Sequence, residues 1–250
     1  MVDLKGKTAL ITGASRGIGE ATARVLAKSG ANVVLTARSE ADIRRIAADI
    51  GSAALAIACD VADYAQVRRA TLQAAKHFGG LDILVNNAGL IDPISRIEAS
   101  DPAAWGSVVD VNVKGVYHGM HAAYPYLKRS GGVIINISSG AATAALEGWS
   151  HYCATKAAVL SLTRCGHKEW AEEGVRVVGL SPGTVATDMQ KAIKASGVNP
   201  VSELDWSDHI SPEWVGRAIA WLATEEARPH DGEDFALRSD EARRLVGLID

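Results

Sequence analysis

The chain has 250 residues, of which 48% are apolar and 22% charged, and its formal net charge is −3. These values are ordinary for a globular protein, and the charge gives no electrostatic reason to expect binding to nucleic acid or an anionic membrane. Three cysteines without CxxC spacing indicate free thiols in a reducing compartment. With no long apolar run and a polar first segment, we expect a cytoplasmic protein with neither a membrane span nor a signal peptide.

Short apolar, β-branched runs alternate along the chain with longer segments of helical spacing. The predicted strands are Thr8–Thr12, Asn32–Thr36, Ala53–Cys59, Ile83–Val85, Val133–Ile137 and Arg176–Leu180, and the first helices are Ile18–Ser29, Glu40–Ile50 and Ala65–Phe78. Such alternation predicts βαβ units and a parallel sheet with helices on both faces. The polar stretch 184–212, without a strong period, is expected to form a substrate loop or lid within a single domain spanning residues 1–250.

A glycine-rich turn follows the first predicted strand and precedes a helical pattern. It reads Thr12-Gly13-Ala14-Ser15-Arg16-Gly17-Ile18-Gly19. Glycine lacks a Cβ where the backbone must turn tightly or approach a ligand, and a helix that opens near Gly17 directs unpaired N–H groups toward an anion. The pyrophosphate of a dinucleotide is the usual ligand of such a turn, and a simple tight turn is the alternative.

The end of the second predicted strand bears on the kind of dinucleotide. An acidic residue there would bind the ribose 2′-hydroxyl and repel a 2′-phosphate, but this chain has Thr36-Ala37-Arg38. Arg38 can form a bidentate pair with a phosphate, and Arg16 could approach it from the glycine-rich turn. The sequence therefore favours NADP(H) over NAD(H); two solvated surface arginines are the alternative.

Tyr152 and Lys156 are four residues apart in a predicted helix, so both side chains share one helix face. A nearby lysine cation, together with an oxidised nicotinamide, is expected to lower the pKa of the phenol. Taken alone, this spacing occurs by chance in many helices. Its context is the pair Ser138-Ser139 at the carboxyl end of the fifth strand, where a hydroxyl can stabilise negative charge on a substrate oxygen.

Two further asparagine-containing segments complete the pattern. Asn86-Asn87-Ala88-Gly89 ends the fourth strand, and Asn112 is polar among apolar neighbours inside a helical pattern, where a water-bonded helix asparagine is the alternative. With these motifs in order from Thr12 to about Thr187, the chain resembles the short-chain dehydrogenases/reductases. The resemblance implies a Rossmann-like, doubly wound parallel sheet of about seven strands flanked by helices, and a homotetramer or homodimer.

The resemblance also implies a reaction and residue roles. Hydride passes between nicotinamide C4 and a ketone or secondary alcohol, with Tyr152 as general acid/base. Ser139, rather than Ser138, orients the carbonyl; Lys156 lowers the tyrosine pKa and binds the nicotinamide ribose; Asn112 supports a proton-relay water. The implied cofactor contacts, besides Tyr152 and Lys156, are Gly13, Ser15, Arg16, Gly17, Ile18, Gly19, Arg38, Asp60, Val61, Asn87, Ala88, Gly89, Pro182, Gly183, Val185 and Thr187.

Other residues carry weaker expectations. Trp149, Met189 and Trp206 could be walls of the substrate pocket or plain loop packing. His118 and His121 could share a helix face, but no third ligand is suggested, so we expect no metal site. His151 is expected to be a loop residue, and Cys153 and Cys165 small packing residues.

The C-terminal region departs from the family pattern. Gly232 and a strand at Phe235–Leu237 fit, but a charged helical tail from Ser239 to Asp250 replaces the usual ending. Two other functions remain open. A 3-oxoacyl carrier-protein reductase would need a basic surface by the pocket, and the lid carries Asp188, Glu203, Asp205 and Asp208 as well as Lys191 and Lys194. A redox sensor that binds NADPH without turnover commonly lacks the tyrosine or the lysine, and both are present.

Overall fold

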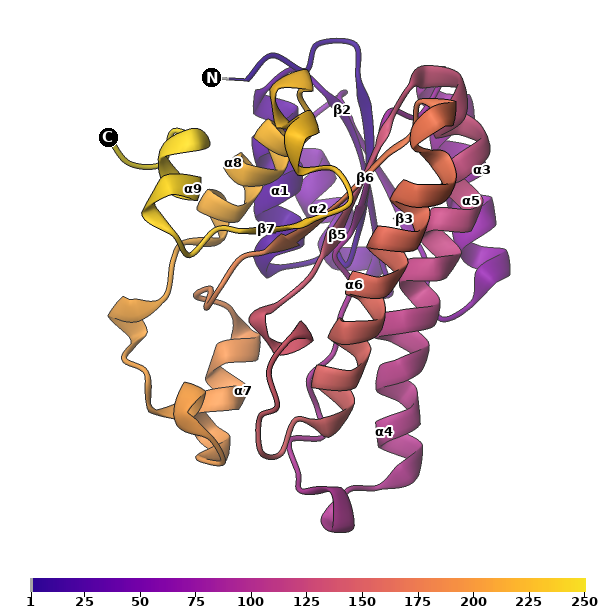
Figure 1. Ribbon diagram of the computed structural model, residues 1–250. Helices are drawn as coiled ribbons and strands as arrows, with labels where there is room; N and C mark the ends of the chain where they lie inside the picture. The colour runs from indigo at the N-terminus through magenta and orange to yellow at the C-terminus, as the bar shows by residue number, and fades with distance from the viewer. Residues whose placement is uncertain (1) are drawn as a thin grey trace.

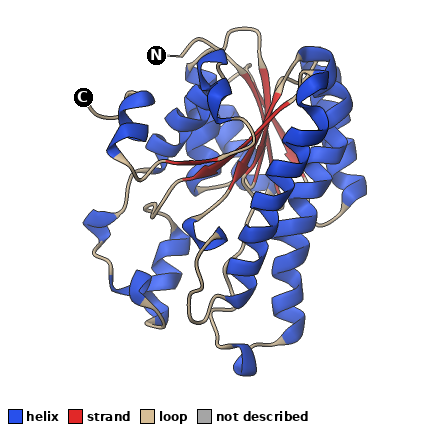
Figure 2. Ribbon diagram, viewed as in Figure 1, coloured by secondary structure: helices blue, strands red, loops and turns tan. Residues whose placement is uncertain are grey.

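Seven strands form one parallel sheet in the order β3-β2-β1-β4-β5-β6-β7 (Figures 1 and 2). The computed structural model describes residues 2–250. The strands are β1 (Thr8–Thr12), β2 (Asn32–Ala37), β3 (Ala54–Ala58), β4 (Ile83–Asn86), β5 (Val133–Ile137), β6 (Arg176–Ser181) and β7 (Asp234–Ala236). The predicted seven-stranded doubly wound sheet is confirmed, and the last strand begins one residue earlier than expected.

Helices cover both faces of this sheet (Figure 1). They are α1 (Gly17–Lys28), α2 (Glu40–Ile50), α3 (Tyr64–Phe78), α4 (Pro102–Val109), α5 (Gly115–Ser130), α6 (Ser150–Trp170), α7 (Asp188–Ser196), α8 (Pro212–Leu222) and α9 (Asp240–Leu245). The apolar faces of α1, α2 and α8 pack in one core cluster, and those of α3, α5 and α6 pack in another. Because the central strands are buried on both faces, they are apolar throughout rather than alternating.

The strand order reverses direction beside β1. From β1 the chain builds outward through β2 and β3, then returns to add β4 on the other side of β1. The two adjoining connections leave the sheet in opposite directions, and the carboxyl ends of strands at such a reversal are where open α/β sheets bind their ligands. The glycine-rich turn and the Asn87-Ala88-Gly89 segment both follow these strand ends.

Two segments differ from their sequence patterns in helix content. Residues 184–212 contain α7 and two short 3₁₀ helices, η5 (Pro200–Glu203) and η6 (Trp206–Asp208). The helical spacing of α7 could not be recognised in the sequence because only Gln190 and Ile193 of this helix are buried, and each is followed by an exposed lysine. The predicted C-terminal helix ends early, since α9 stops at Leu245 and Gly247 takes a φ of 66°.

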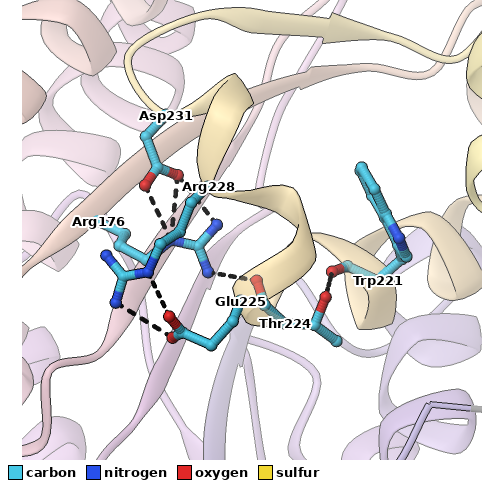
Figure 3. Close-up of polar contacts among 6 residues, drawn as sticks. All are labelled: Arg176, Trp221, Thr224, Glu225, Arg228 and Asp231. Carbon is cyan, nitrogen blue, oxygen red and sulfur yellow. Dashed lines mark hydrogen bonds and ion pairs between the residues drawn. The ribbon is translucent and has the colours of Figure 1, made fainter.

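A buried ion pair fixes the connection that leads from α8 to β7 (Figure 3). Arg176, the first residue of β6, donates from Nε and Nη2 to the carboxylate of Asp231 at 2.9 to 3.1 Å. Its Nη1 donates to the Thr224 carbonyl at 2.7 Å. The two charged side chains are 4% and 9% exposed, so they interact in a medium that screens charge weakly. This pair anchors the chain three residues before Asp234 enters the sheet.

Within residues 2–250, no helix has the length and hydrophobicity needed to cross a membrane.

Candidate active site

The glycine-rich turn lies directly against the end of β4. Gly13 has a φ of 65°, and a Cβ there would lie 2.8 Å from the Ala88 Cα. Thr12 links the two segments, because its Oγ1 accepts hydrogen bonds from the Asn87 and Ala88 N–H groups at 3.0 Å each. The Asn87 side chain donates in return to the Thr12 carbonyl at 2.8 Å. Thr12 is a positioning residue that its apolar strand context did not reveal.

The turn opens onto the start of α1 and fits a dinucleotide pyrophosphate. Among residues 2–250, no side chain caps the N-terminus of α1, whereas Asp63 and Ser211 cap α3 and α8. The first N–H groups of α1 therefore lack a side-chain acceptor, as anion binding requires. At Gly17 an added Cβ would lie 3.3 Å from Thr187, so the predicted cofactor segment of the lid contacts the turn.

Substituting Gly19 by Ala should prevent cofactor binding. The added Cβ would lie 2.3 Å from the Gly13 carbonyl oxygen and 2.8 Å from the Ala14 Cα, so the backbone of the turn would have to shift. We expect NADPH to bind at least about 10-fold more weakly, as measured by fluorescence titration. The reason is that the shifted backbone would weaken each phosphate contact by about 1 kcal/mol. Gly140→Ala is the matched control, since a Cβ there meets nothing within 4 Å. Equal NADPH affinity for both variants would contradict the assignment.

The segment Asp60-Val61, which was expected to contact the cofactor, is held in place by α5. The Val61 carbonyl accepts a hydrogen bond from His118 Nδ1–H at 2.8 Å, and Asp60 Oδ1 accepts one from the Ala62 N–H at 3.0 Å. Gly115 allows the close approach, since a Cβ there would lie 2.8 Å from a Val61 methyl group. His118 therefore holds the Asp60-Val61 segment, a role that its sequence neighbours did not indicate.

The two arginines expected at the 2′-phosphate are exposed. Arg38 follows the end of β2 and lies at the surface. Arg16, the N-cap residue of α1, has its side chain 76% exposed and lies 3.7 Å from the Asp188 carboxylate at the start of α7. Both side chains of this ion pair are largely solvated, so the pair contributes little to stability. Arg16 can therefore exchange Asp188 for a phosphate.

Tyr152 lies in the first turns of α6, with its side chain almost wholly buried. Its ring packs edge-to-face on Trp149 at a centroid distance of 5.6 Å, and the Ser139 hydroxyl lies near enough to its phenol to lower the phenol pKa. The structure thus brings together Ser139, from the end of β5, and Tyr152, as expected. Burial raises the pKa of Tyr152 to about 12, and the Ser139 hydroxyl opposes that rise. The expected lowering of this pKa is not seen, because desolvation of the phenolate outweighs the favourable contacts.

Lys156 is buried one turn beyond Tyr152. Its Nζ lies 5.5 Å from the centre of the Tyr152 ring and donates a hydrogen bond to the Ile137 carbonyl at 2.7 Å. Burial lowers the pKa of Lys156 to about 8, and the charge of Asp234 opposes that effect. Since this value lies above neutral pH, the ammonium form prevails at pH 7. Asp234 is a member of the site that the motif search did not include.

Asn112 lies in a one-turn π-helix, η2 (Asp110–Lys114), between α4 and α5, rather than in a regular helix. Its side chain accepts from the Leu90 N–H at 2.8 Å and donates to the Leu90 carbonyl and the Thr155 hydroxyl at 2.9 and 3.1 Å. π-Bulges of this kind are frequent at functional sites. The alternative of a water-bonded helix asparagine is wrong, since the Asn112 amide is 1% exposed and joins the segment after β4 to α6.

His151 is not a loop residue, as was expected, but belongs to the first turn of α6 and is fully buried. Its Nε2–H donates to the Ile91 carbonyl at 2.5 Å, next to the backbone that Asn112 holds. The helix begins at Ser150, and the preceding turn of glycine and tryptophan hid that start in the sequence. His151 and Asn112 together fix the segment that follows Gly89.

The walls around Tyr152 are apolar. Trp149 and Tyr152 pack in one buried cluster with Ile91 and Ile193, and Met189 lies against it. Trp149 and Met189 are thus beside the reacting group, as a pocket wall requires. Trp206 does not belong to this cluster, because it lies in η6, is 46% exposed and packs on His209.

The remaining predicted cofactor residues lie where the chain leaves β6 toward residues 184–212. Pro182 and Gly183 follow the end of β6, and Val185 is buried and pairs with Ile210 in an isolated parallel bridge. The bridge closes residues 186–209 into a loop whose two ends meet. Cys153 packs against the cluster of Trp149 and Tyr152, as predicted, whereas Cys165 is exposed and is not a packing residue.

A family model described as short chain dehydrogenase matches residues 7–197. This chain belongs to the short-chain dehydrogenase/reductase family. As a member of this family it is an oxidoreductase that acts on CH–OH or C=O groups.

Several known proteins resemble this short-chain dehydrogenase/reductase along nearly its whole length. An uncharacterised oxidoreductase of Staphylococcus saprophyticus is 35% identical, over 95% of this chain and 98% of the relative. The cis-4-hydroxycyclohexanecarboxylate dehydrogenase of Sinomonas cyclohexanicum is 36% identical, over 88% and 90%. The crystal structure of 3-ketoacyl-(acyl-carrier-protein) reductase from Brucella melitensis, complexed with NADH, is 35% identical and superposes with a TM-score of 0.84, over 94% and 98%.

Proposed function

We propose that this protein reduces a ketone with NADPH, or oxidises the matching secondary alcohol with NADP⁺, and that Tyr152 is its general acid/base. The observation that carries the proposal is the burial of Tyr152 and Lys156 one turn apart on α6, next to Ser139 at the end of β5 and beside an apolar wall. A phenol that is protonated at neutral pH can give its proton to a developing alkoxide.

In the proposed mechanism the bound nicotinamide supplies or accepts a hydride at its C4 position. The turn from Gly13 to Gly19 would hold the pyrophosphate, and Lys156 the nicotinamide ribose. Ser139 donates a hydrogen bond to the substrate oxygen, where negative charge develops. Tyr152 transfers its phenolic proton to that oxygen, and the Lys156 ammonium stabilises the phenolate that remains. Asn112 holds the backbone beside Lys156, next to the water from which we propose the tyrosine regains its proton.

A ketone panel tests this function. Purified protein is mixed with NADPH and a series of cyclic, aliphatic and aryl ketones, and the fall in nicotinamide absorbance is followed. We expect turnover of at least one ketone class, and oxidation of the matching alcohol with NADP⁺. Tight NADPH binding without turnover of any ketone or alcohol would instead favour a redox sensor.

The preference for NADPH rests on Arg38, since the exposed end of β2 carries a cation where an acid would bind the ribose 2′-hydroxyl. Arg38→Leu is expected to raise the KM for NADPH by about 10-fold, the effect of losing one charge-assisted phosphate contact, and to leave the KM for NADH unchanged. Arg44→Leu, on the exposed face of α2, is the matched control. A wild-type enzyme that prefers NADH would overturn this part of the proposal, and the Brucella melitensis relative, solved with NADH, makes the comparison necessary.

A second candidate is reduction of a 3-oxoacyl group on carrier protein, because the Brucella melitensis relative is named for it. The lid surface argues mildly against an acidic protein partner, since Lys191 is paired with Asp188 and Lys194 bonds the Leu204 carbonyl. A 3-oxoacyl thioester added to the ketone panel distinguishes the two.

We also propose that the 250 residues act as one domain with a lid at 184–212, in the cytoplasm, as a homotetramer or homodimer. These proposals rest on the single sheet and on the family. Light scattering coupled to gel filtration tests the assembly, and cell fractionation tests the location.

A further inference from the structure

The end of β5 carries three successive contacts of the site. The Ile137 carbonyl accepts the hydrogen bond of the Lys156 ammonium at 2.7 Å, and the Ser139 hydroxyl lies beside Tyr152. Between them, the Ser138 hydroxyl donates to Asp234 Oδ2 at 3.0 Å. Ser138 is 2% exposed, and its partner is 96 residues away along the chain. The proposed mechanism uses the first and third of these contacts and gives no role to the second.

Asp234 is an unusual residue for its position. It opens β7, at the edge of the sheet, and pairs in register with Gly179 of β6. A Cβ at Gly179 would lie 2.9 Å from Asp234 Oδ1, so glycine makes room for the carboxylate there. Oδ1 is buried and has no hydrogen-bond partner within residues 2–250. A carboxylate with one unpartnered, desolvated oxygen is costly to bury unless a cation lies nearby.

Lys156 and Arg164 supply that positive charge. Both lie on α6, and both lower the pKa of Asp234, as does the Ser138 hydroxyl, whereas burial and the neighbouring Glu233 raise it. Lys156 is 6% exposed and Arg164 lies at the surface, so solvent screens the lysine less. In return, Asp234 is the charged group that raises the pKa of Lys156 against the effect of burial.

We infer that Asp234 is a positioning residue of the Tyr152–Lys156 site: through Ser138 it fixes the end of β5, and with its negative charge it keeps Lys156 protonated. The inference rests on the proposed function only for its kinetic readout. The Arg176–Asp231 pair, three residues earlier, holds the start of β7 against β6 and thereby keeps Asp234 in register (Figure 3).

The sign of the effect of Asp234→Asn follows from electrostatics. Removing a negative charge lowers the pKa of a nearby lysine, here Lys156. Ketone reduction needs both the Tyr152 phenol and the Lys156 ammonium protonated, and loss of the first of these protons ends activity as pH rises. The alkaline limb of kcat/KM is therefore expected to move down by about one pH unit, at the low end of the effect of a close opposite charge. Asn keeps an acceptor for Ser138, so the end of β5 stays bonded.

Two matched measurements make the test specific. Glu233→Gln removes one negative charge from the residue just before β7, but this side chain is exposed and screened, so the alkaline limb of this variant should stay at the wild-type pH. NADPH affinity, measured by fluorescence from pH 6 to 10 without substrate, should weaken at a lower pH in Asp234→Asn, because the ammonium of Lys156 is lost earlier. This binding readout separates the two proposals: a shifted binding midpoint with no ketone turnover supports the inference and rejects the proposed function.

The inference is wrong if folded Asp234→Asn keeps both the wild-type alkaline limb of kcat/KM and the wild-type pH midpoint of NADPH binding. It is also wrong if Glu233→Gln shifts these two quantities as much as Asp234→Asn does. Circular dichroism checks the fold of each variant. If Asp234→Asn does not fold, Ser138→Ala gives the answer. It removes the hydrogen bond that holds the Asp234 carboxylate, so this negative charge is no longer fixed beside Lys156 and the alkaline limb should move down by a smaller amount. A wild-type profile for Ser138→Ala would then reject the inference.

Discussion

Tyr152→Phe is expected to lower kcat by about 10²- to 10⁴-fold, the usual contribution of a positioned proton donor. The substitution removes the hydroxyl and keeps the ring, so packing on Trp149 at 5.6 Å and the buried cluster around it should be preserved. NADPH affinity should change little, because the glycine-rich turn and Arg38 are untouched. Steady-state kinetics on the best ketone of the panel and a fluorescence titration with NADPH measure the two quantities separately.

Tyr117→Phe is the control for this substitution. Tyr117 lies on α5 and is 51% exposed, and the same atom is removed far from the pair of Tyr152 and Lys156. It should turn over ketone at the wild-type rate. If Tyr152→Phe keeps most of its turnover while it binds NADPH normally, the proton must come from another group and the proposed mechanism is wrong.

Arg176→Met is expected to lower the free energy of unfolding by about 3 to 5 kcal/mol, the cost of leaving one partner of a buried ion pair alone. Asp231 would then lack the three hydrogen bonds that Arg176 donates, and the Thr224 carbonyl would lose its donor (Figure 3). Urea unfolding followed by circular dichroism, at one fixed protein concentration in case the chain is oligomeric, measures the change.

Two comparisons show whether burial causes this loss. Lys114→Met breaks the ion pair with Asp110, whose partners are 60% and 45% exposed, and should cost at most about 1 kcal/mol. The double variant Arg176→Met/Asp231→Leu should recover much of the stability, since no unpaired charge remains. A loss in Arg176→Met no larger than that in Lys114→Met would show that the pair contributes no more than a surface contact.

The local chemistry of this protein could be predicted from its sequence, because each motif is a short run of residues on one element. The turn from Gly13 to Gly19 and the spacing of Tyr152 and Lys156 are of this kind. The strands were predicted for a similar reason: a sheet buried on both faces requires continuous apolar runs, such as Val133–Ile137.

Partners from distant elements could not be predicted in this way. The hydrogen bond of Ser138 spans 96 residues, and that of His118 to Val61 spans 57. Neither histidine nor serine signals such a partner by type, since both are common at surfaces. The pKa of Tyr152 shows the same limit: the spacing shows that a lysine is near, but not that the phenol is desolvated, and this desolvation raises the pKa.

The end of β5 also limits how this site can change. Successive side chains of a strand point to opposite faces, so Ser138 reaches toward β7 while Ser139 reaches toward Tyr152. Inserting or deleting one residue in β5 would exchange the two directions and separate both serines from their partners at once. The loop after Gly140 and helix α7 have no such alternation to preserve. New substrate preferences are therefore to be sought by changing the length and composition of those segments, with β5 left intact.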